Sequence, residues 1–337
     1  MVVYTQFKDG YKMETTWGTS LIEDADDIAY IWGIYSKNCS HPSPVTSVIY
    51  GETGVNEVES PDGSLTKGVF VLNGQYGIIP FNGILLWMVM GLSSTVGADP
   101  YTHTITVPAA VDGVLPELPS FTVQHERTGT AADWSTQYLG CKINEMQIIS
   151  NYKTRGLVFL LDVMAKSTEK VAFTLNNEPT FATGTSEFPY LYINMTRTYD
   201  GADLDGMVGM QLTINNDIMA EYANTFDTVT HNFTGMWPQF FTEGDRKIYS
   251  LDIEYQPEAS DIWEELLVST ITKPIVFKWT KSANDYIQIT CTDCGVIGHT
   301  MVSPKTSEEP RLDRITIEFR SISIEVKDSI AGGFYGE

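Results

Sequence analysis

Apolar and polar residues alternate along much of this chain with the period of a β-strand. The alternation is clearest in residues 104–107, in 121–123 after the proline-containing break at 118–120, and in 315–326. Residues 157–163 are almost all apolar, which is typical of a strand covered on both faces. The pattern predicts a mainly β protein whose strands are joined by polar turns.

Two of these strands contain a slip in the alternation. One slip falls among apolar positions otherwise spaced by two, namely Cys141, Ile143, Met146 and Ile148. The other falls near Arg320 and Ser321, where we expect a β-bulge. Further strands are predicted at 28–35, 45–50, 68–72, 247–255, 275–279 and 286–290.

Polar and turn-forming segments separate the strands. Residues 38–44 contain two prolines and predict a turn, and Gly51–Lys67 predicts a polar loop. The first 20 residues are polar and contain glycine, so we expect them to take their order from a neighbouring molecule.

Two segments have helical periodicity. In residues 82–94 the apolar positions Ile84, Leu85, Met88 and Leu92 fall on one face, and Asn82 is placed to cap the start. Residues 261–267 predict a second short helix. A stripe of Met and Trp on a helix is usually core, so neither segment indicates a cofactor site.

The length of 337 residues suits one large domain or two of ordinary size. We divide the chain into a first β domain at 1–172, a linker or crossover at 173–189, and a second β domain at 190–337. A weak echo supports this division, since residues 146–149 resemble 210–214 and 161–163 resemble 251–253. One elaborated domain stays open as the alternative.

Acidic residues outnumber basic ones by 43 to 21, for a net charge of −22. A chain of this sign repels phosphate at long range, which disfavours sequence-specific DNA binding. It suits either a conduit that DNA crosses without sticking or plain solubility. The longest apolar run, 84–90, is too short to span a bilayer, which needs about 20 residues, and we expect no membrane partner.

Candidate chemistry is sparse. Cys291 and Cys294 form a CxxC motif, and His299 follows, but a zinc site would need further ligands near them. His103 lies in a predicted strand and is expected to be structural. No nucleophile elbow or phosphate loop is present in the sequence. We therefore expect no enzyme activity, no catalytic residue, no cofactor and no bound metal.

Several short motifs, in this order and spacing, resemble the tail tube proteins of long-tailed, siphovirus-like bacteriophages or archaeal tailed viruses. They are Met90-Gly91-Leu92 at the end of an apolar helix, His103 followed by Leu118–Val123, Gly140–Asn144, and Gly209–Asn216. In the last motif Asn215 stands where the family usually has an acidic residue.

The resemblance implies a tail-tube-type β-barrel or β-sandwich with flanking short helices, in one or two tandem tube domains. It implies a virion protein, made in the host cytoplasm, that assembles into stacked rings. In such rings we expect the loop 51–67 and both termini to make the contacts between one ring and the next. Two tandem domains would give a trimeric, pseudo-sixfold ring, and one domain a hexamer. The implied partners are other copies of itself, the tape measure, tail terminator and distal tail proteins, and duplex DNA passing through the lumen.

Two other functions stay open from the sequence. One is a different virion β-protein, such as a tail terminator or a decoration protein. The other is a carbohydrate-binding β-sandwich, for which the seven Trp and 17 Tyr residues would offer stacking surfaces.

Overall fold

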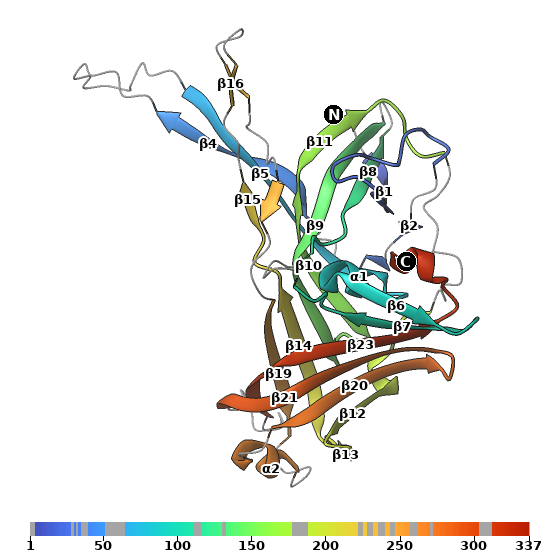
Figure 1. The fold of residues 1–337 in the computed structure, drawn as a ribbon, viewed down its shortest axis with the longest axis vertical. Coiled ribbons are helices and arrows are strands. Elements are labelled where there is room, and N and C mark those ends of the chain that lie inside the picture. Colours follow the sequence, from blue (N-terminus) through green and yellow to red (C-terminus); the bar gives the residue numbers. More distant parts are fainter. Residues whose placement is uncertain are drawn as a thin grey trace, which may run out of the picture.

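A central antiparallel sheet runs through the whole molecule (Figure 1). The computed structural model describes residues 4–27, 30–31, 33–34, 40–50, 65–110, 116–129, 133–176, 188–221, 225–227, 232–234, 240–242, 247–256, 262–269, 272–302 and 312–336. Within them the mainly β class is confirmed, with two short α-helices among many strands. None of the helices in these ranges is long and apolar enough to cross a membrane.

The central sheet contains eight strands, and each pairs antiparallel with the next. Across the sheet they are β4 (Ser40–Tyr50), β5 (Leu65–Ile79), β10 (Leu157–Ala165), β9 (Trp134–Asn151), β14 (Met207–Asn215), β19 (Ile248–Tyr255), β22 (Leu312–Glu318) and β21 (Asp285–Val302). The short β3 (Gly33–Ile34) also pairs with β5.

Two further sheets extend from the first halves of the two longest strands. The first joins β2 (Tyr30–Ile31), β1 (Tyr4–Met13), β8 (Phe121–Gly129), β9 and β11 (Ser167–Val171). The second joins β13 (Ala202–Asp203), β12 (Met195–Tyr199), β20 (Lys273–Ser282), β21, β23 (Ser321–Asp328), β7 (Tyr101–Thr106) and β6 (Leu92–Val96).

The chain passes twice through the same series of elements. The first pass is β1, β4, β5, α1 (Ile84–Met90), β8, β9, β10 and β11, and the second is β12, β14, β19, α2 (Ile262–Val268), β20, β21, β22 and β23. With the helix counted as the fourth element of each pass, the first element pairs with the fifth, and the sixth pairs with the fifth, seventh and eighth. We call the two passes repeat 1 and repeat 2.

Equivalent residues of the repeats make equivalent bonds where β9 and β21 leave their outer sheets. A residue with positive φ precedes a cysteine in both, Gly140 at 64° and Asp293 at 56°. Each cysteine, Cys141 or Cys294, donates to the carbonyl three residues earlier over 3.3 Å. The hydrogen bond from Lys166 N to Leu139 O (2.9 Å) also has its counterpart, from Arg320 N to Thr292 O (3.0 Å).

A one-residue irregularity follows at the same distance in both strands. The pairing of β9 with β10 skips Asn144, and the pairing of β21 with β22 skips Ile297. The slip seen in the sequence between Ile143 and Met146 is therefore a β-bulge. The other slip was interpreted wrongly: β22 ends at Glu318 and β23 begins at Ser321, so the chain there changes sheet rather than bulging.

The echo found in the sequence paired the wrong strands. Residues 146–149 lie in β9 and 210–214 in β14, which are neighbours in the sheet, whereas the counterpart of β9 is β21. Similar alternation along all the central strands produced the false match. Repeat 1 lies within residues 4–171 and repeat 2 within 195–328. The domain boundaries at 172 and 190 stay a prediction, because β9 and β14 join the repeats in one sheet.

The first helix is shorter than the predicted 82–94. Gly91, with φ at 102°, ends α1, and its N–H donates to Trp87 O over 2.7 Å. Leu92 then begins β6 and is exposed. All seven residues of α1 are buried, because the helix lies between the sheets rather than on a surface. Asn82 accepts from Ile84 N over 3.0 Å, one residue ahead of the geometric N-cap Gly83.

Other predicted elements were largely confirmed. The second helix occurs at Ile262–Val268 with Trp263 and Leu266 buried, and most predicted strands coincide, to within a residue at their ends, with parts of β4, β5, β7, β8, β10, β19, β20 and β21. Of the strand predicted at 28–35, the described residues form the short strands β2 and β3. The turn at 38–44 was wrong from Ser40 on, where β4 begins with a register shift. Most of the expected loop, residues 51–64, lies outside the described residues.

Both described ends of the chain pack on their own molecule. β1 pairs with β8 along its length, and Tyr11 is buried opposite Val123. The expectation that a neighbouring molecule orders the N-terminal segment was therefore wrong for its described residues. Backbone pairing supplies that order, and a polar composition does not reveal it. At the other end Tyr335 is fully buried and donates to Asp328 Oδ2 over 2.8 Å.

A large core lies on one face of the central sheet. Apolar side chains at alternate positions of β9, β10, β14, β19 and β22 meet α1 and the outer sheets there. The main ones are Met146, Ile148, Phe159, Leu161, Leu212, Ile214, Leu251, Ile253, Ile315 and Ile317. The opposite face of the same strands carries polar residues, as period-two alternation requires.

Gly140→Ala tests the corner of β9. Both Gly140 and Gly201 have positive φ, but a Cβ on Gly140 would lie 2.7 Å from Lys166 Cβ and 2.7 Å from Trp17 Nε1, whereas Gly201 has nothing within 4 Å. Urea unfolding should show a loss of about 1 kcal/mol for the control Gly201→Ala and about 2–4 kcal/mol for Gly140→Ala. Equal losses would show that the corner can relax freely.

Candidate functional site: a polar sheet face and two open strand edges

The face of the central sheet that points away from the core is polar and acidic. Its alternate positions include Glu145 on β9, Asp162 on β10, Asp252 and Glu254 on β19, and Glu318 on β22. Arg314 on β22 offsets part of this charge, and its Nη2 lies 2.8 Å from Asp252 Oδ2. The face therefore has an excess of negative charge.

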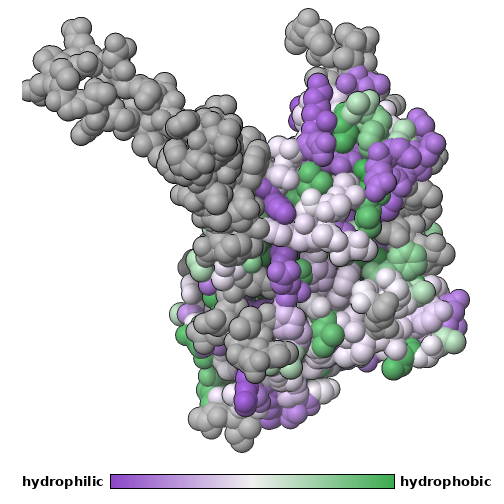
Figure 2. All heavy atoms as spheres, turned by 45° about the horizontal axis from the view of Figure 1, so that its top comes forward, coloured by the Kyte–Doolittle hydropathy of each residue, from purple (hydrophilic) through white to green (hydrophobic). Residues whose placement is uncertain are grey.

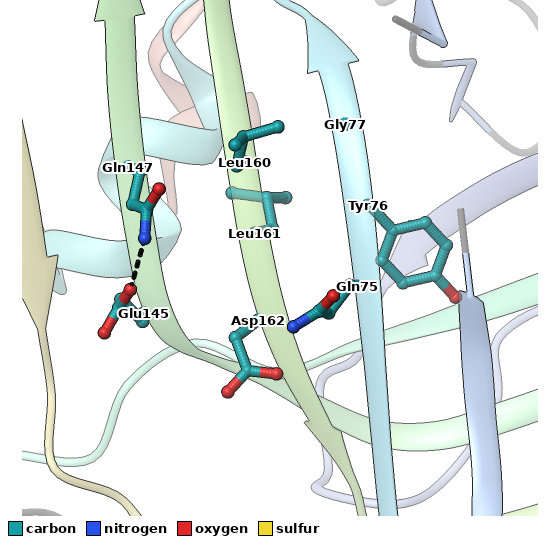
Figure 3. Close-up of a pocket in the computed structure, with 8 residues that line it drawn as sticks. All are labelled: Gln75, Tyr76, Gly77, Glu145, Gln147, Leu160, Leu161 and Asp162. Atoms are coloured by element: carbon teal, nitrogen blue, oxygen red, sulfur yellow. Dashed lines mark hydrogen bonds between the residues drawn. The ribbon is translucent and has the colours of Figure 1, made fainter. Parts of the chain in front are cut away.

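Glu145 and Asp162 lie side by side across the sheet. Figure 3 shows them with Gln75 on three neighbouring strands, over a shallow depression of about 320 Å³. Glu145 accepts hydrogen bonds from Gln147 Nε2 (2.8 Å) and Asn215 Nδ2 (3.1 Å). Amide side chains thus hold the carboxylates in place.

Burial raises the pKa of the Asp162 carboxyl, and the nearby charge of Glu145 raises it further. A hydrogen bond from Asn144 Nδ2 (3.4 Å) acts in the opposite direction without cancelling the effect. Burial and the repulsion from Glu145 both disfavour the charged form of Asp162. Its negative charge therefore lowers the stability of the isolated, folded chain.

Both ends of the central sheet are open strand edges. In the part of the chain that the structure describes, β4 pairs only with β5, and residues 295–302 of β21 pair only with β22. Ile297 and Met301 on the β21 edge are 60% and 65% exposed. The residue of β9 that corresponds to Met301 is Ile148, which is fully buried beside β14. An exposed apolar edge of this kind is a template for another chain.

Figure 2 shows hydrophobic side chains scattered in small groups among hydrophilic and neutral ones on the face that it presents. The β21 edge is therefore the more informative apolar feature, since its exposed residues lie on a strand segment that pairs with β22 on one side in the described part of the chain.

Extensions project from the central sheet in both repeats, on the same end of the molecule (Figure 1). In repeat 1 the extension is the far part of the β4–β5 hairpin. In repeat 2 it is the connection from β14 to β19, with the pairs β15 (Met219–Glu221)–β18 (Phe240–Thr242) and β16 (Thr225–Asp227)–β17 (Asn232–Thr234). Phe241 of the second extension packs on Trp17 of repeat 1, with ring centroids 5.3 Å apart.

The cysteines and His299 of the suggested metal motif have structural positions. Cys291 and Cys294 are buried, and burial raises the pKa of both thiols. His299 Nε2 lies 3.1 Å from Asp313 Oδ2. No group of three or more metal-binding side chains occurs among the residues for which positions are described.

His103 is structural, as predicted. Its two ring nitrogens lie 2.7 Å from Thr95 Oγ1 and 3.1 Å from Asp328 Oδ1, and its ring stacks on Tyr335 at 3.9 Å. The order Thr–His–Asp resembles a proton relay, but His103 is fully buried and no substrate can reach it. The cluster instead fixes the C-terminal segment to β6 and β7.

Sequence reasoning did not locate the acidic face, although the signal was present. Asp162 stands in an otherwise apolar run, and Asp252 and Glu254 alternate with buried aliphatic residues. Such carboxylates mark the solvent face of a strand once the strand is known to be central.

Comparisons with known proteins give limited information. No family model and no curated protein matches this chain. One similar solved structure is the anti-feeding prophage cap, described as a tube-terminating cap, at 15% identity over 42% of this chain and 94% of that chain, with a TM-score of 0.29. Another is the anti-feeding prophage baseplate, at 12% identity over 39% and 89%, with a TM-score of 0.24. With such TM-scores, neither supports a functional argument.

Asp162→Asn should stabilise the isolated chain at neutral pH. Because the folded-state pKa of Asp162 is raised, the native state holds the proton more tightly than the unfolded state, and stability falls as pH rises through the interval above 3.8. Unfolding followed from pH 3 to pH 7 should show a smaller decline in the variant. Asp203→Asn, at an exposed position, is the matched control and should leave the decline unchanged.

Proposed function

We propose that this chain is a structural subunit of a phage-tail-like particle, whose copies close into rings and stack into a tube for DNA passage. The observation that carries the proposal is a sheet open at both ends whose internal junction, β9 with β14, already joins two like repeats. A ring formed in the same way would leave no open edge. The subunit acts by assembly, without a catalytic step.

Three copies fit the width that duplex DNA needs. With strands about 4.8 Å apart and tilted about 40°, a barrel of about 24 strands is roughly 48 Å across its backbone. Side chains of about 5 Å on each wall leave a bore of roughly 38 Å for a duplex about 20 Å wide. Two copies would leave roughly 22 Å by the same estimate, with no room for hydration.

The acidic face suits the wall of that bore. Curved inward, it would place Glu145, Asp162, Asp252, Glu254 and Glu318 around the passing phosphates. Fixed negative charge repels DNA from every side, so the duplex does not adhere. The extensions of both repeats lie on one end of the subunit, where they can reach the next ring (Figure 1).

Further assignments follow from the resemblance noted in the sequence. The location is the virion tail, after synthesis in the host cytoplasm. The partners are the tape measure inside the tube and the terminator and distal tail proteins at its ends. The tube of a long-tailed virus is the specific case that we favour.

Purified protein should form rings with a central hole in negative-stain micrographs, and stacked rings at higher concentration. The reason is that ring closure pairs two backbone edges per copy, and stacking engages the extensions. Mass photometry should give a closed species of three copies. Rings that never stack would indicate a terminator, and a monomer at every concentration would contradict ring formation.

Glu254→Lys tests the direction of the acidic face. In assembled tubes it should produce salt-sensitive binding of a short duplex DNA, measured by fluorescence anisotropy, because the added lysines would line the bore. Asp203→Lys, at an exposed position on β13, makes the same charge change outside the central sheet. Equal DNA binding by both variants would place Glu254 outside the bore.

A further inference from the structure

The junction between β9 and β14 provides a template for contact between copies. Seven residue pairs join these strands, from Gly209 opposite Asn151 to Asn215 opposite Glu145. Beyond Asn215 the chain is held at the β9 bulge, where Asn216 N donates to Asn144 O (2.8 Å) and Ile218 N to Asn144 Oδ1 (2.8 Å). The bulge thus fixes the register of the junction.

The same strand with the same bulge lies open at the far end of the sheet. Counting from the equivalent corners, Asn144 corresponds to Ile297 and Glu145 to Gly298. In the closed junction the strand beside the bulge is β14, and its counterpart in repeat 1 is β4, the open strand at the other end. Every element of a second junction is therefore present in one copy, but at opposite ends of the sheet.

We propose that residues 295–302 of β21 pair with β4 of a second copy of this chain, in the register of the β9–β14 junction. This inference rests on the proposed ring and names the strands that close it. The pairings of β4 with β5 and of β14 with β19 make Val45 the counterpart of Asn215. Val45 of the second copy then lies opposite Gly298.

The β21 edge has the chemistry of a surface that becomes buried. Met301 is exposed where its counterpart Ile148 is buried, and Ile297 is exposed where its counterpart Asn144 is partly buried. Gly298 offers no side chain where the incoming strand would approach. Pro42 and Pro44 lie in β4, and prolines in sheets occur mainly on edge strands. Because proline has no backbone N–H, β4 offers fewer hydrogen-bond donors than β14 does. Apolar contacts would therefore contribute more to the association.

A paired cysteine experiment tests this register. Directly opposite residues in an antiparallel pair have Cα atoms about 4.5–5.5 Å apart, which is within disulfide range. The double variant Val45→Cys/Gly298→Cys, oxidised in assembled rings, should give covalent species up to the size of the closed ring on non-reducing gels. Within one copy the two positions lie at opposite ends of an eight-stranded sheet and cannot meet.

Val45→Cys/Gly295→Cys is the matched control. A Cβ is tolerated at both glycines, with nearest neighbours at 3.6 Å for Gly298 and 4.0 Å for Gly295, but Gly295 is displaced by about 10 Å along the strand. The single variants measure any cross-linking through native cysteines. Cross-linking at 298 and not at 295 is the expected result.

The other outcomes separate this inference from the proposed function. Rings in the micrograph with no cross-link at 298 would overturn this junction and leave the ring intact. Equal cross-linking at 295 and 298 would overturn the register. Monomers without any cross-link would overturn both the junction and the ring.

Discussion

Antiparallel backbone pairing between β9 and β14 is the contact on which the architecture depends. It joins the two repeats into one sheet, although each repeat also has its own set of paired strands. Each hydrogen bond of such a ladder contributes about 0.5–1.5 kcal/mol net, but an unmade bond in a buried edge costs more. The same physics favours a further strand beside the edges that β4 and β21 present in the described part of the chain.

Local geometry makes this pairing possible in two places at once. A residue with positive φ turns each long strand from an outer sheet into the central sheet, and a cysteine hydrogen bond fixes the corner. A bulge three residues beyond each cysteine then sets the register of the next strand. Glu14 reinforces the corner in repeat 1, where it accepts hydrogen bonds from Gly140 N and Thr122 Oγ1 at 2.8 and 2.7 Å.

The repeats differ where their surroundings differ. In repeat 1 the bulge residue is Asn144, whose Oδ1 accepts a hydrogen bond from Ile218 N in the segment after β14. In repeat 2 the bulge residue is Ile297, which is exposed. The β6–β7 hairpin of repeat 1 pairs with β23 and so ties the outer sheet of repeat 2 to the first half of the chain. Strand pairing thus joins the two repeats at β9–β14 and again at β7–β23.

The sequence by itself determined the mainly β class, most of the described strands and the slip between Ile143 and Met146, because these depend on alternation over a few neighbouring residues. The bulge that it predicted near Arg320 was wrong. It also marked His103 as structural. It did not determine the end of α1 at Gly91, the order of the N-terminal strand, or the true match between the repeats, since each depends on contacts with distant segments. The acidic face and the open edges likewise emerged only in the tertiary structure. Which side of a strand faces outward, and which strand lies at an edge, is decided by pairing between residues far apart in the chain.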